Sequence, residues 1–426
     1  MKSKLSMTTF LHFYLPSNFI PFLMKKTFKV SLVFAVLIIL ISLLRLSPFG
    51  YLIKGVRLSY LQGETSAHPT DWYGFNLRTV EKGSTTAGKI VKLSNRFDYK
   101  LSKKLMSELE KTNSASYLIY RNDTLICEKY FNGYSDSHRT NSFSMAKSIM
   151  ALLVQKSIQE GYISSWDEKA IKFIPWLNEN ANFSTNKTES AQFVQELTLR
   201  HLITMTAGLE WDESYVSPWG VTAKAYYSDD VEGVLRSVPL VRKPGTHWQY
   251  QSGATQLLTF CLMQALQNPP NNLPVYNTVS SYFSDKFWKP LNMEADAYWS
   301  LDHENGKELG YCCFNAISRD FGRLGLLALH QGNWNGEQII DSSFFALAAQ
   351  PWKHINYSHG FWISPSTKIP FYYYQGLKGQ YICVIPSKNT VIVRTGNGVD
   401  KGNSTDKVHD CVKVYVEEGL TVNGFR

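Results

Sequence analysis

The stretch Ser142-Phe143-Ser144-Met145-Ala146-Lys147-Ser148-Ile149-Met150 places a serine three residues before a lysine, at the point where a helix is predicted to begin. Positions i and i+3 share one face of a helix, so the two side chains would lie side by side. A lysine in a partly desolvated pocket loses its proton near neutral pH and accepts the proton of a neighbouring hydroxyl. We therefore predict that Ser144 is a nucleophile and that Lys147 is its general base.

The helix predicted after this pair is too apolar for a surface helix. Residues 148–154 are almost all apolar, and Gly161 ends the pattern as a C-cap after Glu160. Taken alone, the Ser-x-x-Lys spacing is weak, because it arises by chance in most chains of this size. The alternative is an N-cap serine followed by a lysine whose stem lies along a helix surface.

The composition indicates a folded protein and argues against a nucleic-acid partner. The 426 residues are 44% hydrophobic and 14% aromatic, which suffices for one large domain or two smaller ones. The formal charge is +9, but no acidic residue precedes Glu64 and most of the excess lies in that segment. The rest of the chain is nearly neutral. The basic residues before Glu64 are Lys2, Lys4, Lys25, Lys26, Lys29, Arg45, Lys54 and Arg57.

The N-terminal region has the pattern of a membrane-targeting segment. Residues 30–44 are apolar except for two serines, and three lysines precede them. We predict a basic segment over 1–29 and a transmembrane signal anchor over 30–46, with the catalytic domain on the periplasmic or outer side of the cytoplasmic membrane. No small-x-small site follows, which favours a retained anchor over a cleaved signal. A start at Met24 fits such a signal equally well. A buried core helix would not explain the one-sided charge.

The cysteines do not suggest a metal site. None of them has a paired metal-ligand spacing, so we predict no metal ligands, and neighbouring Cys312 and Cys313 would form only a strained bridge. Disulfide pairing after export stays open. The six cysteines are Cys127, Cys261, Cys312, Cys313, Cys383 and Cys411.

The order of strand-like and helix-like segments predicts an α+β fold. We expect a linker over 47–96 and one folded domain over 97–420, beginning near Phe97. In this domain one antiparallel sheet is built from both chain ends and flanked by helices, with a helical lobe inserted between them. The segments are a hairpin over 116–130, mostly helix over 167–310, a second hairpin over 379–395 and a closing helix over 405–418.

Four further blocks carry a resemblance to a known family. In chain order they read QEGYISSWDEKAIKFIPWL over 159–177, LTLRHLITMTAGL over 197–209, PGTHWQYQS over 244–252 and AISRDFGRLG over 316–325. Together with the Ser-x-x-Lys stretch they resemble the serine β-lactamase and penicillin-binding-protein-like hydrolases over about 97–419. The similar branch is the class C-related one, which includes esterases and 6-aminohexanoate-dimer-hydrolase-like amidases. The resemblance implies a β-lactamase/transpeptidase-like fold.

The resemblance also implies further site residues. Tyr250 would hydrogen-bond to Ser144 and Lys147 and relay a proton to the leaving group. Ser252 stands where the family has an asparagine that contacts the substrate amide. The loop Trp211-Asp212-Glu213-Ser214-Tyr215 is similar to one that lies over the pocket in amide-hydrolysing members, which makes Tyr215 a candidate substrate contact.

The family's third motif matches Gly376-Leu377-Lys378-Gly379-Gln380. This register puts Leu377 where a cation usually contacts substrate, and Gly379 at the motif's glycine. Lys378 would then point to the other face, because neighbouring strand residues alternate. By resemblance, the backbone N–H groups of Ser144 and Gln380 form the oxyanion hole, a role that requires no particular side chain.

These expectations combine into a membrane-anchored, exported serine hydrolase. It would form and hydrolyse an acyl-enzyme on Ser144, with a small-molecule ester or amide as substrate and neither a metal nor an organic cofactor. One alternative is a catalytically silent penicillin-fold protein that binds cell-wall peptides or partners. Another is a β-lactamase or DD-peptidase, which keeps the chemistry and changes the substrate.

Overall fold

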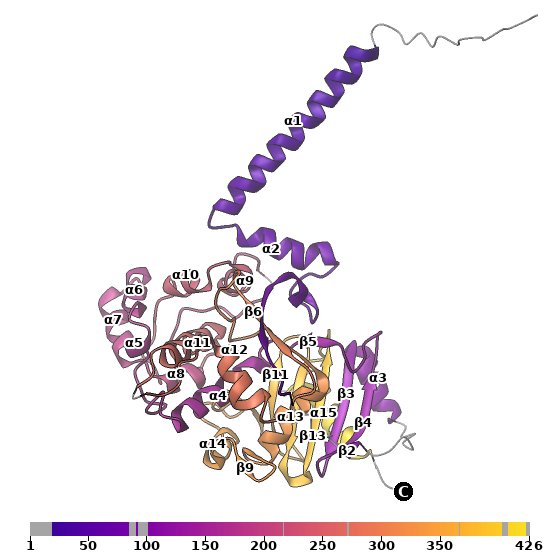
Figure 1. Ribbon diagram of the computed structural model, residues 1–426, viewed down its shortest axis with the longest axis vertical. Helices are drawn as coiled ribbons and strands as arrows, with labels where there is room; N and C mark the ends of the chain where they lie inside the picture. Colours follow the sequence, from indigo (N-terminus) through magenta and orange to yellow (C-terminus); the bar gives the residue numbers. More distant parts are fainter. Residues whose placement is uncertain are drawn as a thin grey trace, which may run out of the picture. The chain divides into compact units, whose positions relative to one another are not determined.

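The computed structural model describes residues 19–84, 91–92, 101–215, 217–270, 272–365, 367–402 and 408–422, and divides the chain into two compact units, Met1–Ile53 and Lys54–Arg426. The first unit contains helix α1 (Phe19–Leu46) (Figure 1). Within the described residues no single helix is both long and apolar enough to cross a bilayer. By length and composition alone, Ser31–Leu46 is sufficient for a span only together with Tyr51–Gln62, from which a sharp bend separates it. The signal anchor and the orientation it implies stay predictions.

The second unit is built around a seven-stranded sheet that joins the two ends of the domain. Its order is β10-β11-β12-β13-β3-β4-β2, and all neighbours pair antiparallel except β2 and β4. Figure 1 shows the purple strands β3 and β4 beside the yellow β13. The two predicted hairpins, β3–β4 and β12–β13, are confirmed. The strands are β2 (Val91–Lys92), β3 (Ser114–Arg121), β4 (Thr124–Tyr130), β10 (Trp362–Ser364), β11 (Phe371–Gly376), β12 (Gln380–Ile385) and β13 (Thr390–Gly396).

Helices cover both faces of this sheet. Strand residues alternate between two cores, so that Val391 and Val393 of β13 face the larger one and Ile392 faces the smaller one. Helices α3 (Lys103–Lys111) and α15 (Asp410–Leu420) line the smaller core, while α4 (Met145–Gln159) and α13 (Ser318–Leu329) belong to the larger. The remaining helices are α2 (Tyr51–Leu58), α5 (Ala170–Phe173), α6 (Leu177–Asn180), α7 (Lys187–Glu196), α8 (Leu199–Ile203), α9 (Val221–Tyr227), α10 (Val231–Arg236), α11 (Ser252–Gln267), α12 (Val279–Phe283) and α14 (Ser342–Ala348), with short turns η1 (Tyr60–Gln62), η2 (Asp71–Gly74), η3 (Ala181–Phe183), η4 (Ser284–Trp288) and η5 (Pro386–Lys388).

A second sheet has four strands and includes part of the segment 47–96, which was predicted to be a linker. Its order is β1-β6-β7-β5, and β1 pairs with β6 more than 200 residues further along the chain. Asp71, just before β1, is 3% exposed and accepts hydrogen bonds from Asn141 Nδ2 and Tyr226 Oη. Residues 54–84 are therefore part of the folded unit, whereas the expected start near Phe97 lies outside the described residues. The strands are β1 (Asn76–Val80), β5 (Arg139–Asn141), β6 (Ala297–Leu301) and β7 (Phe314–Ile317); a separate hairpin joins β8 (Asn333–Trp334) and β9 (Glu337–Gln338).

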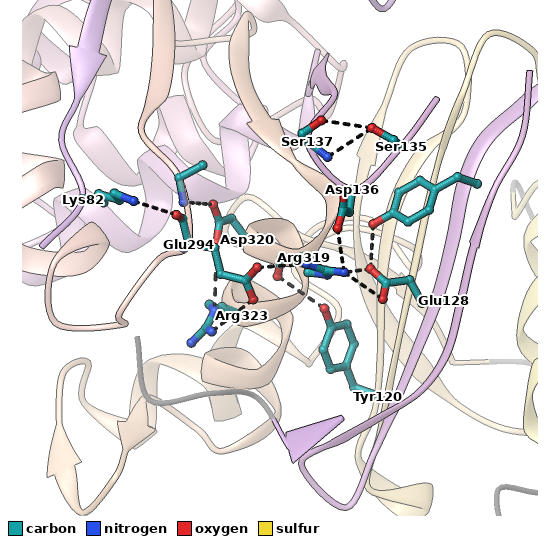
Figure 2. Close-up of polar contacts among 12 residues, drawn as sticks. Lys82, Tyr120, Glu128, Ser135, Asp136, Ser137, Glu294, Arg319, Asp320 and Arg323 are labelled. Atoms are coloured by element: carbon teal, nitrogen blue, oxygen red, sulfur yellow. Dashed lines mark hydrogen bonds and ion pairs between the residues drawn. The ribbon is translucent and has the colours of Figure 1, made fainter. Parts of the chain in front are cut away.

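A network of charges fixes the start of α13 (Figure 2). The Arg319 guanidinium donates to Glu128 of β4 and lies 3.0 Å from Asp136 and 3.3 Å from Glu294. The buried Asp320 carboxylate accepts the backbone N–H of Glu294 at 2.7 Å. Each charge in the network faces an opposite charge or a hydrogen-bond donor, as burial requires. The network holds α13 to β4 and to the turn before β6, so Arg319 and Asp320 of the block AISRDFGRLG have structural partners.

Gly208, in the loop that follows α8, packs directly against the backbone of Arg242. Its φ is +79°, and a Cβ on it would lie 2.1 Å from the Arg242 carbonyl oxygen. The N–H of Val241 donates to the Gly208 carbonyl at 2.8 Å. Only glycine tolerates both the left-handed backbone and this contact.

We predict that Gly208→Ala destabilises the fold by about 3 kcal/mol, from the left-handed backbone and the clash together. The matched control is Gly133→Ala. Gly133 has the same φ of +79°, but nothing lies within 4 Å of its added Cβ, so its cost should be about 1 kcal/mol. Denaturant unfolding of both variants measures the difference, and equal losses would contradict the assigned contact.

Candidate active site

Ser144 lies where a strand turns sharply into a helix. Strand β5 ends at Asn141, and Ser142 continues its pairing by donating its N–H to the Phe314 carbonyl at 2.8 Å. Phe143 then adopts φ +45°, a left-handed conformation that is uncommon for a bulky residue, and its N–H is held by Asn141 Oδ1 at 2.9 Å. Helix α4 begins at the next residue after Ser144. The turn therefore places the half-buried Ser144 hydroxyl at the first turn of a buried helix.

Lys147 lies beside Ser144 and is almost completely buried, with 1% of its side chain exposed. Its Nζ is 2.8 Å from Ser144 Oγ, 3.0 Å from Ser252 Oγ and 3.0 Å from the Tyr311 carbonyl oxygen. Burial lowers the pKa of Lys147 to about 8, and the Glu213 carboxylate acts in the opposite direction. A neutral amine is therefore accessible near physiological pH, as a general base requires.

Tyr250 comes from the segment just before α11. Its hydroxyl lies near Ser144, which lowers the pKa of Tyr250 against the larger effect of burial, and Lys147 Nζ lies 5.0 Å from the centre of its ring. The ring also contacts those of Trp362, at 5.4 Å, and Tyr357, at 5.9 Å. Burial raises the pKa of Tyr250 well above its usual range, so the phenol keeps its proton at neutral pH. Lys147 Nζ therefore lies over the face of the Tyr250 ring, and the Tyr250 hydroxyl lies near Ser144.

Ser252 is the first residue of α11, and its environment contains a residue that the sequence did not single out. Its hydroxyl and its backbone N–H both donate to the Glu213 carboxylate, at 2.5 and 2.7 Å. Trp211 Nε1 donates to the same carboxylate at 2.7 Å, as does the Tyr215 hydroxyl at 2.5 Å. Tyr215 is 37% exposed. The sequence did show that Glu213 is an acidic residue in a loop expected to lie over the pocket. No local pattern indicated that it would bind Ser252, 39 residues further along the chain.

The third motif forms a tight turn between β11 and β12. Gly376 pairs with Gln380, and Lys378 and Gly379 both have positive φ. A Cβ on Gly376 would lie 2.1 Å from the Ser142 carbonyl oxygen, so this end of β11 touches the turn before the nucleophile.

The side chains of this motif have structural partners. Leu377 packs at the edge of the larger core, and Lys378 Nζ is 3.7 Å from Glu64 in the lead-in. The Gln380 side chain donates to the Gly396 carbonyl at 2.6 Å, which ties it to β13. The oxyanion role of the Ser144 and Gln380 N–H groups stays a prediction.

The neighbouring cysteines lie close to the lysine. Cys312 and Cys313 are joined by a disulfide, directly after Tyr311. The Cys312 carbonyl accepts the Trp299 indole N–H at 3.1 Å, which anchors the segment that supplies the Tyr311 carbonyl. Among the described residues, no group of three or more His, Cys, Asp or Glu side chains is arranged to hold a metal ion.

Comparison with known proteins gives the chain its relatives. A family model described as Beta-lactamase matches residues 103–410. An uncharacterized protein of Alkalihalophilus pseudofirmus is 24% identical over 343 residues, which cover 72% of this chain and 90% of the relative.

Solved structures show the same fold. A protein of Bacillus anthracis named as a candidate 6-aminohexanoate-dimer hydrolase has a TM-score of 0.66 and 20% identity, covering 82% of this chain and 91% of its own. EstCE1, described as a hydrolase with promiscuous acyltransferase activity, has a TM-score of 0.55 and 13% identity, covering 75% and 99%.

The lowered pKa of Lys147 sets an expected pH dependence for Ser144. Only the neutral amine accepts the serine proton, so covalent labelling of Ser144 by a fluorophosphonate should rise with pH and level off above a midpoint of about 8. The measurement is the second-order labelling rate from pH 6 to 10, each point taken where the protein stays folded. A rate that is flat across this range would contradict a general base with this pKa.

Proposed function

Because the chain belongs to the Beta-lactamase family, we propose that it is a serine hydrolase that cleaves an ester or amide bond through an acyl-enzyme on Ser144. The observation that carries the proposal is the 2.8 Å contact between Ser144 Oγ and the buried Lys147 Nζ. A buried lysine in contact with a hydroxyl and with no carboxylate touching its nitrogen is costly to keep for stability alone. A role of the Lys147 amine in accepting the Ser144 proton would explain why this burial is kept.

The proposed reaction proceeds in two halves. In the first, Ser144 Oγ attacks the substrate carbonyl carbon while its proton moves to Lys147 Nζ, and the oxyanion forms against the N–H groups of Ser144 and Gln380. The leaving group departs with a proton passed through Tyr250, and Ser144 holds the acyl group as an ester. In the second half, water attacks that ester and gives its proton to the same base, which frees the acid and restores Ser144.

The surroundings of the site favour a substrate without a carboxylate near the third motif. Leu377 is apolar, and the neighbouring Lys378 ammonium is engaged by Glu64. The half-buried ring of Trp362 packs beside Tyr250 and adds an apolar surface. Neutral esters and amides fit these surfaces. The name of the Bacillus anthracis relative favours an amide as the bond that is cleaved, since 6-aminohexanoate dimers are linked by an amide.

The proposed anchor over 30–46 would place this reaction outside the cytoplasm. The proposal rests on the charge asymmetry of the N-terminal region. Recovery of the full chain in the soluble fraction, with an intact N-terminus, would contradict it.

We predict that Ser144→Ala abolishes fluorophosphonate labelling and ester turnover while leaving the thermal unfolding midpoint nearly unchanged. One hydroxyl at a helix start contributes little to stability, whereas it supplies the only atom that the mechanism acylates. Ser142→Ala is the matched control, because Ser142 is two residues away and its hydroxyl bonds to backbone groups of Phe143 and Phe314. Labelling that survives Ser144→Ala would refute the mechanism.

We also predict that uncharged esters are hydrolysed faster than β-lactam antibiotics. A charge-assisted hydrogen bond to the β-lactam carboxylate is worth about 1.5 to 3 kcal/mol, or roughly ten- to a hundredfold in binding, and Leu377 cannot supply it. The values of kcat/KM for p-nitrophenyl butyrate and for nitrocefin, measured on one preparation, make the comparison. Equal efficiencies would show that another cation serves this role, and Lys378→Ala would then identify it.

A further inference from the structure

Glu213 holds a position that neither the family blocks nor the proposed reaction explains. It lies in the loop between α8 and α9, and its carboxylate accepts from Trp211 Nε1, from the Tyr215 hydroxyl and twice from Ser252. The N-cap residue of α11, Gln251, makes no side-chain capping bond. Glu213 therefore caps this sixteen-residue helix from another loop, where the helix dipole favours a negative charge.

The hydrogen-bond inventory of Ser252 fixes the direction of its hydroxyl. A hydroxyl has one proton to donate, and an ionised carboxylate can only accept. The proton of Ser252 Oγ therefore points to Glu213, 2.5 Å away. The lone pairs of the same oxygen remain for Lys147 Nζ at 3.0 Å. Lys147 must donate in this contact.

The same reasoning applies to the three contacts of Lys147. The Tyr311 carbonyl oxygen can only accept, so it takes one N–H of the lysine at 3.0 Å. Ser252 takes a second N–H. A neutral amine has two protons and one lone pair, so the third contact, with Ser144 Oγ at 2.8 Å, receives the lone pair. That is the arrangement in which Lys147 accepts the serine proton.

We propose that Glu213 is a positioning residue that, through the Ser252 hydroxyl, directs the lone pair of Lys147 at Ser144. The inference rests on the proposed function, since it assigns a role within the same proton transfer. It also bears on the replacement of the family's asparagine by Ser252. The oxygen of an asparagine amide can only accept a hydrogen bond, whereas a serine hydroxyl both donates and accepts. Serine at this position needs a fixed acceptor behind it, and Glu213 is that acceptor.

Glu213 also supplies the charge that acts on Lys147. The other titratable groups that face the lysine are Tyr250 and Tyr311, whose rings lie 5.0 and 5.6 Å from Nζ, while Tyr215 and Tyr357 lie next to Glu213 and Tyr250. Burial raises the pKa of Tyr250, Tyr311 and Tyr357, and partial desolvation beside the Glu213 carboxylate raises that of Tyr215, so all four stay neutral at pH 6 to 9. Glu213 raises the pKa of Lys147 against the effect of burial. Removing its charge should shift that pKa below about 8.

The test is the pH profile of fluorophosphonate labelling for the wild type, Glu213→Gln and Asp212→Asn. In this reaction Ser144 Oγ bonds to phosphorus, fluoride leaves, and the serine proton passes to Lys147. The Asp212→Asn control removes the same charge from the neighbouring residue of the loop, whose carboxylate accepts the Ser214 N–H and touches neither Ser252 nor Lys147.

For Glu213→Gln we expect two separable changes. The plateau rate falls by about 10- to 100-fold, because a glutamine amide can donate to Ser252 and let its hydroxyl compete for the lysine lone pair. The midpoint of the profile moves to lower pH, because the charge that raised the pKa of Lys147 is gone. Asp212→Asn should match the wild type in both. A role confined to helix capping would lower the unfolding midpoint and leave the pH profile of the folded fraction unchanged, which would overturn the proposal.

The outcomes separate this inference from the proposed function. If the Ser144→Ala variant is labelled as fast as the wild type, the proposed function is wrong. If labelling depends on Ser144 but Glu213→Gln keeps the wild-type plateau and midpoint, only the role of Glu213 fails. Should Glu213→Gln not fold, Ser252→Ala decides: the inference requires its plateau to fall about tenfold or more, and an unchanged plateau overturns it.

Discussion

The burial of the Lys147 amine against the Ser144 hydroxyl is the constraint on which the rest of the site depends. Removing an ammonium from water costs several kcal/mol even after the protein relaxes, and no carboxylate of the described residues touches this one. The cost falls if the group is neutral, which the lowered pKa of Lys147 allows. A carbonyl and two hydroxyls can solvate a neutral amine. Glu213 stands one hydroxyl further away, close enough to orient the group without forming an ion pair with it.

The fold assembles this arrangement from segments that are far apart in the chain. The β5 turn and α4 supply Ser144 and Lys147, the start of α11 supplies Ser252, and the loop after α8 supplies Glu213. The end of β11 approaches so closely that Gly376 leaves no room for a side chain beside Ser142. Both sheets are needed, because one carries β5 and the other carries β11. The site therefore lies where they meet, and its geometry depends on the packing of each sheet.

Local patterns were enough to predict the elements that carry their own signal. The Ser-x-x-Lys pair and the two hairpins depend on residues near one another in sequence, and each is where the pattern indicated. The closing helix is present but runs over Asp410–Leu420 rather than 405–418. The lead-in was missed because β1 is a short strand with mostly exposed or half-buried residues, and its partner β6 is more than 200 residues away. Glu213 was missed for the same reason. For Lys378, strand alternation predicted a side chain turned from the site, but the chain turns here with φ +60° and the ammonium meets Glu64.

Lys147 should lose its proton near pH 8, well below the range of an exposed lysine, and the titration of its own amine measures this. Protein labelled with carbon-13 at lysine Cε, compared with the Lys147→Arg variant to assign the resonance, reports the protonation state independently of any reaction. We expect one lysine signal that titrates near pH 8 and is lost in the variant. If the Lys147 signal instead titrates with the exposed lysines at about 10.4, almost no neutral amine is present near pH 8 and Lys147 is not the general base of Ser144.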